Sequence, residues 1–421
     1  MKNNLEYMRI QRYVGNRVLR YVFIVSFFLL IPFFLLARTP VIPLHIDEIA
    51  WFIDTDAFEQ IFLKRDVTSS FWQTNQRYDQ PPLVKYIYGG YLWMKDPKVF
   101  RNRERLEKEW GRWGIYNNPS TTETGFDIFG PYIRQMRQIN SIALIGTLLA
   151  FYLLLIFVGN INIVVAMLGT ALLSQNMLFL QEMTHATHDG FMLCYMVFAV
   201  LFYCLYIKNK KIFMLVLAIF CAALSVASKL TGVIVVVGIL MSQMIKVLNE
   251  VKQKKQSLVH CIVITLSIFI LWIFVNPTLY KEPIKNTVKY FSYRMDQTTR
   301  LQEAYPSASL IKPSDKVRAS WCTLIAPACY GFYEKGTFTS LAWVNVSLVL
   351  FGLYYLIHRI LNNTKQEYTY MLGIFLFLVI TWNVGFLPMH YGRYYLPTQI
   401  GIFFISTCGL EWLRGRMCRR K

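Results

Sequence analysis

Apolar runs about as long as a membrane span recur along this chain, and they constrain its fold more than any other feature. A helix needs roughly 20 apolar residues to cross a hydrocarbon core about 30 Å thick. The chain of 421 residues is 55% hydrophobic and its mean hydropathy is +0.36, which is typical of a protein embedded in a bilayer. Its apolar runs predict about ten transmembrane helices, at 21–37, 139–158, 161–180, 190–207, 212–228, 232–248, 257–275, 340–357, 369–388 and 395–413.

The fold class expected from these runs is an all-α polytopic membrane protein with a single domain over 1–421. The run at 21–37 is expected to stay as an anchor, because a cleaved signal peptide would not be followed by so many further spans. Lysine and arginine are concentrated at both ends and in alternate short loops, which the positive-inside rule assigns to the cytoplasm. Both termini are therefore expected in the cytoplasm, at the plasma membrane of a prokaryote or the ER membrane of a eukaryote. This asymmetry accounts for the net charge of +20 without a nucleic-acid partner.

Two long segments are expected outside the cytoplasm, at 38–138 and 276–339. The later segment contains several prolines, which predict irregular backbone with short helices. Cys322 and Cys329 lie in it, either as free thiols or as a disulfide. In the first segment, apolar and charged residues at near-helical spacing predict helices near the membrane surface, at 46–63, 83–94 and 98–113.

The polar residues near the ends of the spans collect on the extracytoplasmic side. Ionisable groups at a membrane are costly unless they are paired or face water, so a cluster on one side is a candidate functional site. Glycosyl transfer requires a carboxylate that takes the acceptor proton and cations that stabilise a leaving phosphate. The members of the cluster are Asp47, Glu48, Lys85, Asp189, Lys229, His390, Arg393 and Tyr394.

Asp47 and Glu48 are adjacent, so on a helix their side chains diverge by about 100° and cannot share one proton. Asp47 is the candidate general base, and Glu48 is expected to position the acceptor or another side chain. The alternative is that both are ordinary acidic residues in a first helical turn, where they complement the helix dipole.

Three basic residues are candidates for binding a donor phosphate. Lys85 follows Pro81 and Pro82 and either neutralises phosphate or extends toward the interface as a surface lysine. Arg393 lies between His390 and Tyr394, where its planar guanidinium either binds phosphate or anchors a span end. Lys229, at another span end, has the same two interpretations.

The segment His185 to Asp189 contains two histidines and a carboxylate, which is fewer ligands than a convincing metal site has. Asp189 itself either points into a cavity or caps the helix that it begins. No cofactor is expected to be obligatory, and a divalent cation at the phosphate stays open.

The order of these residues resembles the dolichyl-phosphate-mannose protein O-mannosyltransferase family and its prokaryotic relatives, the phospholipid-carrier-dependent glycosyltransferases of the C-type fold. The resemblance extends along most of the chain, although Gln80 stands where that family has histidine, Val84 where it has glycine, and Thr184 where its members often have arginine. The matching motifs are Asp47–Glu48, Gln80–Lys85, Asp189, Lys229–Gly232, Asn276–Tyr280 and Arg393–Pro397.

The resemblance implies a C-type architecture and an inverting transfer of mannose, or another hexose or pentose, from a polyprenyl or dolichyl phosphate. The acceptor is an extracytoplasmic hydroxyl of a protein, lipid or glycan. Asp47 would act as the base, with Arg393 and Lys85 stabilising phosphate charge.

The main alternative is a transporter or flippase for a lipid-linked sugar, which would also carry buried charges facing a groove. Such proteins often contain inverted repeats, and this sequence shows none. A noncatalytic scaffold would not need the one-sided polar cluster, and another lipid-carrier enzyme such as an acyltransferase is a further alternative.

Overall fold

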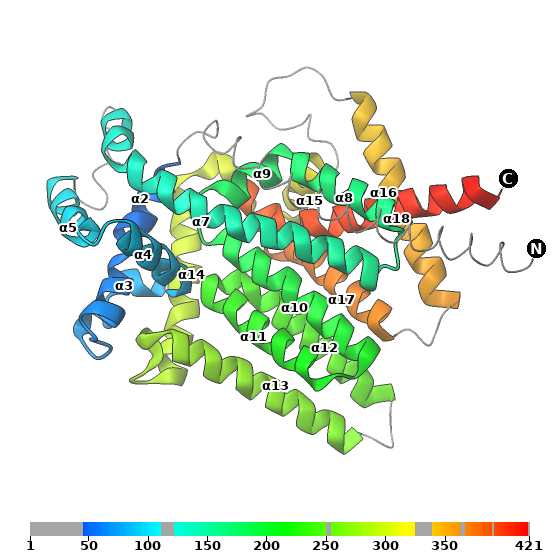
Figure 1. Cartoon of the computed structure of the whole chain (residues 1–421), viewed down its shortest axis with the longest axis horizontal. Helices are drawn as coiled ribbons and strands as arrows, with labels where there is room; N and C mark the ends of the chain where they lie inside the picture. Colours follow the sequence, from blue (N-terminus) through cyan, green and yellow to red (C-terminus); the bar gives the residue numbers. More distant parts are fainter. Residues whose placement is uncertain are drawn as a thin grey trace, which may run out of the picture. The chain divides into compact units, whose positions relative to one another are not determined.

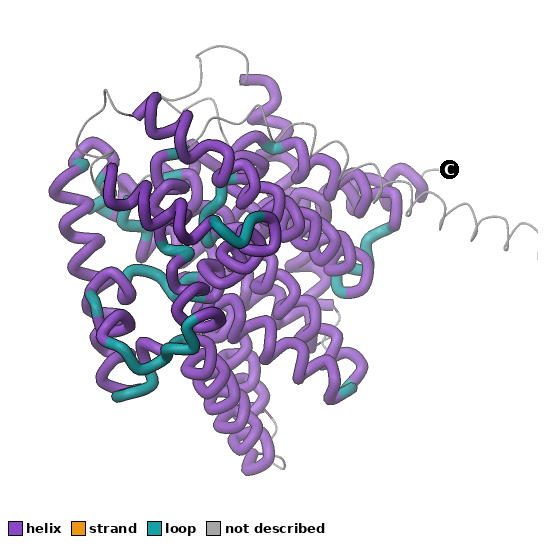
Figure 2. The backbone as a smooth tube through the Cα atoms, turned by 60° about the vertical axis from the view of Figure 1, so that its left-hand side comes forward, coloured by secondary structure: helices purple, strands orange, loops and turns teal. Residues whose placement is uncertain are grey.

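The helices that the structure describes all belong to one of the two compact units of the chain. Contacts within the chain separate Met1–Pro43 from Leu44–Lys421, and every residue described below belongs to the second unit. Within it, the described backbone is almost entirely helical, with one isolated β-bridge between Ser309 and Met389 (Figure 2). The expected all-α fold is confirmed, whereas the single domain stays a prediction. The computed structural model describes residues 45–110, 122–249, 254–324, 339–362, 367–389 and 391–419.

Three helices in the described part of the chain are long and apolar enough to cross a membrane. They are Ile128–Phe157 within α7 (Thr122–Phe157), the whole of α10 (Asp189–Asn209), and Leu258–Val275 within α13 (Lys254–Val275). Each overlaps an expected span, although the first begins at Ile128, 11 residues before the expected start at 139. Shorter apolar stretches lie in α11, α12, α16 and α17.

The chain is thus a helical, membrane-embedded protein, while the number of ten spans and their orientation stay predictions. The expected run at 21–37 lies outside the described residues. The remaining bounds are α11 (Ile212–Ser228), α12 (Val233–Asn249), α16 (Thr339–Asn362), α17 (Glu367–Thr381) and α18 (Leu396–Arg419).

The apolar run at 161–180 forms two helices instead of the one expected. α8 (Ile163–Gln175) and α9 (Met177–Thr184) meet at an angle of 67°. Asn176 causes the break, because its backbone is extended and its side chain accepts a hydrogen bond from the Phe179 amide at 2.8 Å. An asparagine in this position caps a new helix rather than continuing the old one.

α10 is the most deeply buried of the spanning helices and packs against α7 and α11 (Figure 1). In its most apolar stretch 72% of the residues are buried, against 22% in α13. α13 therefore exposes an apolar outer surface, as a helix in contact with lipid does. α16 and α18 pack closely because glycines occupy their crossing: a Cβ atom at Gly352 would overlap the Ile405 carbonyl oxygen, and one at Gly409 would overlap that of Leu348.

The first long segment forms helices that pack against α7. α4 (Leu83–Lys95) and α5 (Val99–Trp110) agree with expectation, whereas the expected helix at 46–63 is broken after α2 (Ile46–Ile53). A short turn of α-helix, α3 (Asp56–Phe58), and a π-helical turn (Glu59–Leu63) follow it. One hydrophobic cluster joins α2, α4, α5, α7 and α10, which fixes the start of α2 relative to the spanning helices.

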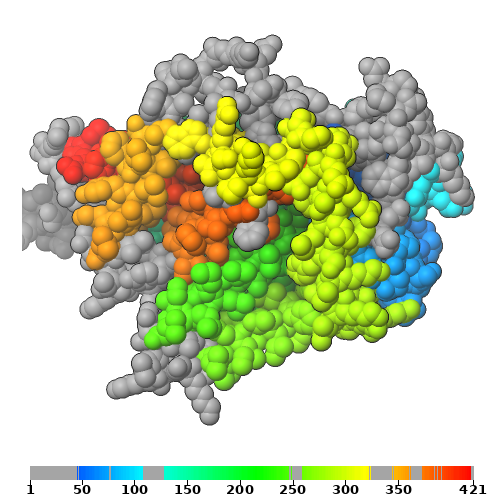
Figure 3. All heavy atoms as spheres, turned by 180° about the vertical axis from the view of Figure 1, so that it is seen from behind, coloured from blue at the N-terminus to red at the C-terminus, as the bar shows by residue number. Residues whose placement is uncertain are grey.

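The later segment is more regular than its prolines predicted. α14 (Pro283–Ala304) has 22 residues, because Pro283 occupies the first turn, where a missing N–H costs no hydrogen bond. Tyr290 on α14 donates a hydrogen bond to the Arg77 carbonyl at 3.0 Å, and Arg294 pairs with Asp79. Figure 3 shows α14 exposed on one face of the molecule. α15 (Pro313–Leu324) follows, and Cys329 lies outside the described residues.

Candidate functional site

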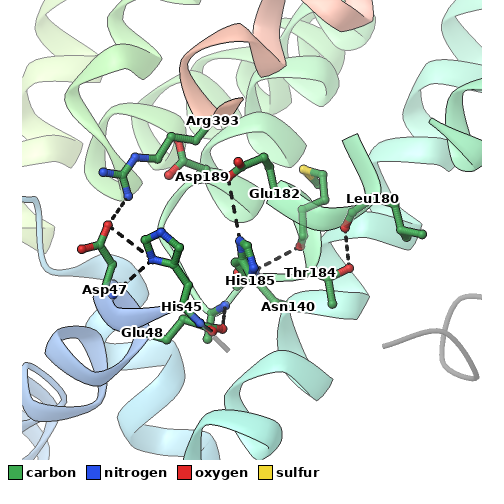
Figure 4. Close-up of polar contacts among 12 residues, drawn as sticks. His45, Asp47, Glu48, Asn140, Leu180, Glu182, Thr184, His185, Asp189 and Arg393 are labelled. Carbon is green, nitrogen blue, oxygen red and sulfur yellow. Dashed lines mark hydrogen bonds and ion pairs between the residues drawn. The ribbon is translucent and has the colours of Figure 1, made fainter. Parts of the chain in front are cut away.

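Asp47 and Arg393 form an ion pair although 346 positions separate them in the chain. The Arg393 Nη1 atom lies 2.5 Å from Asp47 Oδ2, and the two side chains are 22% and 24% exposed (Figure 4). Asp47 lies in the first turn of α2, and Arg393 in the 3₁₀ turn Gly392–Tyr395 that precedes α18. His45 caps α2 and accepts a hydrogen bond from the Asp47 amide at 3.2 Å through Nδ1. A carboxylate and a cation are thereby held together while both stay partly accessible.

Glu48 points into the protein and is fully buried. It pairs with Arg137 of α7, whose Nε and Nη2 atoms lie 2.7 Å and 2.5 Å from its two oxygens. The Ala186 and His45 amides donate to the same carboxylate at 2.6 Å and 2.8 Å. These four donors match the roughly four lone-pair sites of a carboxylate. Glu48 therefore holds the Arg137 side chain and two backbone amides in place. Of the two roles expected for Glu48, this arrangement fits the positioning of another side chain and not of the acceptor.

The loop between α9 and α10, which contains His185 to His188, is held from several sides. Asn140 donates to the carbonyls of Met183, at 3.1 Å, and of His185. Tyr88 on α4 donates to the Thr187 carbonyl at 2.7 Å. Together with the bond from Ala186 to Glu48, these contacts fix the loop to α2, α4 and α7.

Asp189 begins α10 and forms a buried ion pair with Lys229, in which Nζ lies 2.6 Å from Oδ1. The Lys229 ammonium lies 5.3 Å from the ring centroid of Tyr394, and the Arg393 guanidinium lies 5.8 Å from the same ring. Tyr394 thus contacts both cations. Asp47, Arg393, Tyr394, Lys229 and Asp189 form one connected group, as the sequence predicted.

Lys85 is placed differently. Its side chain is 1% exposed and its Nζ lies 3.1 Å from Asp54 Oδ2, which is equally buried. The ammonium also lies 5.8 Å from the Trp51 ring centroid. The surface position that was one interpretation of Lys85 is therefore wrong. His390, expected beside Arg393, lies outside the described residues.

Sequence reasoning missed four residues of this region. Arg137, Asn140 and Tyr88 lie on helices facing the loop, and Asp54 follows α2. Arg137 lies two residues before the expected span at 139–158. An ionisable residue so close to a span was the one sequence signal that could have identified it as part of the site. Nothing in the local pattern distinguishes Asn140 or Tyr88 from residues that only pack.

Among the described residues, His185 lies near one carboxylate and one other histidine, which are fewer ligands than a metal site needs. His185 lies 3.9 Å from Glu182 and its ring lies 5.4 Å from that of His45. Among the residues that the structure describes, no group of three or more histidine, cysteine, aspartate or glutamate side chains could hold a metal ion.

A scan against models of known protein families found no match, and a search of curated proteins found no significant relative.

Proposed function

We propose that this protein is a membrane glycosyltransferase that moves a sugar from a polyprenyl phosphate to an extracytoplasmic hydroxyl, with Asp47 as the general base. The observation that carries the proposal is the pair of Asp47 and Arg393, a partly accessible carboxylate beside a permanent cation. The two functions that the reaction needs, proton acceptance and charge stabilisation, lie side by side in it.

The two acidic residues at the start of α2 differ in exposure. The Asp47 side chain is 24% exposed, whereas Glu48 is fully buried and accepts four hydrogen bonds. A base must come within hydrogen-bond reach of the proton that it removes, about 2.6–3.2 Å between heavy atoms. We therefore assign the base to the accessible Asp47 carboxylate, and Glu48 supports the helix that carries it.

The candidate cations also differ in exposure, and the Lys229 side chain is 8% exposed. Arg393 is 22% exposed and Lys85 only 1%, so we assign the donor phosphate to Arg393. An arginine that engages phosphate would interact less with Asp47. Because a nearby positive charge favours an ionised carboxylate, this shift would make Asp47 a stronger base once the donor is bound.

The transfer balances with these groups. The acceptor oxygen bonds to the anomeric carbon as the bond from that carbon to the phosphate oxygen breaks, and the acceptor proton passes to Asp47. The polyprenyl phosphate leaves with the electron pair and acquires a second negative charge, which Arg393 stabilises. Attack opposite the phosphate inverts the anomeric configuration.

The test uses the purified full chain in lipid nanodiscs with decaprenyl phosphate linked to radiolabelled mannose, glucose or arabinose. Slow release of free sugar to water is expected with one of the three donors, even without an added acceptor. Asp47→Asn should lower this rate by about 10²–10⁴-fold, because it removes the base. Asp296→Asn, at an exposed aspartate of α14, is the matched control and should leave the rate unchanged.

Two results would contradict the proposal. One is full activity of Asp47→Asn in a sample that stays folded and inserted. The other is wild-type protein that cleaves none of the three donors but moves them between leaflets, as a flippase would.

A further inference from the structure

His188 is a buried side chain without the hydrogen bonds that burial normally requires. It is 1% exposed, and neither of its ring nitrogens has a hydrogen-bond partner among the described residues. Its ring lies against that of Trp51, with 3.9 Å between the centroids. Buried polar atoms are satisfied in the great majority of cases, so an unpaired imidazole calls for an explanation.

Two neighbours of His188 share this property. Trp51 Nε1 and Thr187 Oγ1 are also buried and lack a partner in the part of the chain that the structure describes. Thr187 precedes His188 in the loop before α10, and Trp51 reaches the loop from α2. By contrast, Asn140 and Tyr88, which hold the same loop, are both hydrogen-bonded. Trp51, Thr187 and His188 thus bring four buried polar atoms without a partner among the described residues to the start of α10, where the His188 ring lies against Trp51 and Thr187 is the preceding residue.

The charges around this trio are balanced in pairs. Lys85 is neutralised by Asp54 at 3.1 Å, and Lys229 by Asp189 at 2.6 Å. Burial first, and then the charge of Lys85, hold the pKa of His188 well below its usual 6.5, so its imidazole is neutral. A neutral imidazole donates from one nitrogen and accepts at the other. The trio thus offers neutral donors and acceptors next to aromatic rings, which suits an uncharged ligand better than an anion.

A sugar has that chemistry. Each of its hydroxyl groups both donates and accepts, as His188 and Thr187 together do, and its C–H faces pack on aromatic rings such as Trp51. The trio also adjoins the connected group that contains Asp47 and Arg393. His188 directly precedes Asp189, which pairs with Lys229 beside Tyr394.

We propose that Trp51, Thr187 and His188 form a hydroxyl-binding subsite that recognises the sugar of the lipid-linked donor. The subsite rests on the proposed function only in taking the donor as the source of the sugar.

The experiment measures binding and not only turnover. Nanodiscs with the purified full chain are titrated with decaprenyl phosphate and with decaprenyl-phosphate mannose, glucose and arabinose. Wild-type protein should bind at least one sugar-bearing lipid more tightly than the sugar-free lipid. His188→Phe keeps an aromatic ring against Trp51 but removes both nitrogens, so it should lose about tenfold in affinity for that lipid. Its affinity for sugar-free decaprenyl phosphate should not change.

His358→Phe is the matched control, because His358 is an exposed histidine that also lies beside an aromatic ring, that of Tyr354 on α16. It should bind every lipid as the wild type does. Thr187→Val, which is nearly isosteric, gives a second variant should His188→Phe fail to fold, and a loss of several-fold is expected for it.

The outcomes separate this inference from the proposed function. Tighter binding of a sugar-bearing lipid that depends on His188, without any turnover, would uphold the subsite and refute the transferase. The opposite outcome is turnover by the wild type together with an unchanged KM and an unchanged lipid preference in His188→Phe and Thr187→Val. It would uphold the transferase and refute the subsite. Equal wild-type affinity for sugar-free and all sugar-bearing lipids would overturn the subsite.

Discussion

Replacing Arg137 by methionine removes the guanidinium that holds the buried Glu48 carboxylate and leaves an apolar side chain of similar length. The substitution breaks two hydrogen bonds, of 2.7 Å and 2.5 Å, to a side chain with no exposure to water. Among the described residues, Glu48 then keeps the amides of His45 and Ala186 as donors. Its buried negative charge loses the counter-charge of Arg137.

The expected loss of stability follows from these contacts. Each hydrogen bond to a charged group contributes about 1.5–3 kcal/mol, and removal of one partner of a buried ion pair typically costs about 3–5 kcal/mol. We therefore expect Arg137→Met to lower the free energy of unfolding by about 3–5 kcal/mol. Because Glu48 also holds Ala186, the loop before α10 should loosen and become more accessible to protease.

SDS-induced unfolding of the purified protein, followed by tryptophan fluorescence, measures this change. The control is Lys285→Met, which breaks an ion pair with Glu282 of 2.8 Å in which the two side chains are 75% and 54% exposed. An exposed pair contributes at most about 1 kcal/mol, so the control should differ little from the wild type. The double variant Glu48→Gln with Arg137→Met carries no unpaired charge and should recover at least half of the loss.

Equal stability of Arg137→Met and Lys285→Met would refute the reasoning, because it would mean that Glu48 is neither charged nor dependent on Arg137. The stability of the single variant Glu48→Gln is measured as well. If the double variant lost as much stability as Arg137→Met and Glu48→Gln together, the reasoning would also be refuted, because two residues that interact do not have additive effects.

Three further predictions follow from single positions. Gly352→Val should lower the thermal unfolding temperature of the purified protein, because its Cβ would overlap the Ile405 carbonyl, whereas Gly415→Ala, which meets no atom within 4 Å, should not. Burial holds the pKa of His188 below 6.5, so below that pH the unfolded chain binds a proton that the folded chain does not. As the pH is lowered below 6.5, the free energy of unfolding should therefore decrease by up to about 1.4 kcal/mol per pH unit. In His188→Gln, this part of the pH dependence should be missing when unfolding is measured from pH 7.5 to 5. Arg393→Lys keeps the charge but loses the planar guanidinium, so kcat/KM for the lipid-linked donor should fall about 10–100-fold, and an unchanged value would remove Arg393 from phosphate binding.

Apolar length and helical periodicity were enough to predict an all-helical membrane protein and three of its spanning helices. The same signal failed at 161–180, where hydropathy alone could not show that Asn176 ends one helix and caps the next. It also failed at α14, because proline at the first turn of a helix looks in sequence like proline in a loop. Local composition determines whether a segment can be helical, and capping contacts determine where the helix stops.

The sequence predicted that Asp47, Arg393, Asp189 and Lys229 belong to one polar cluster near the span ends, and the structure added how they pair. Sequence could not assign their separate surroundings. Adjacent residues on a helix point in different directions, and only packing against α7 decided that Glu48 is buried on Arg137 while Asp47 stays accessible.

The sequence by itself determined that this chain resides in a bilayer as helices, because each helix satisfies its own backbone and its apolar length is a local property. Tertiary structure alone decided that Lys85 is buried against Asp54, and that the His188 ring lies against Trp51 with both of its nitrogens lacking a partner in the described residues. Burial and pairing depend on residues that are distant in the chain, and no local pattern contains that information.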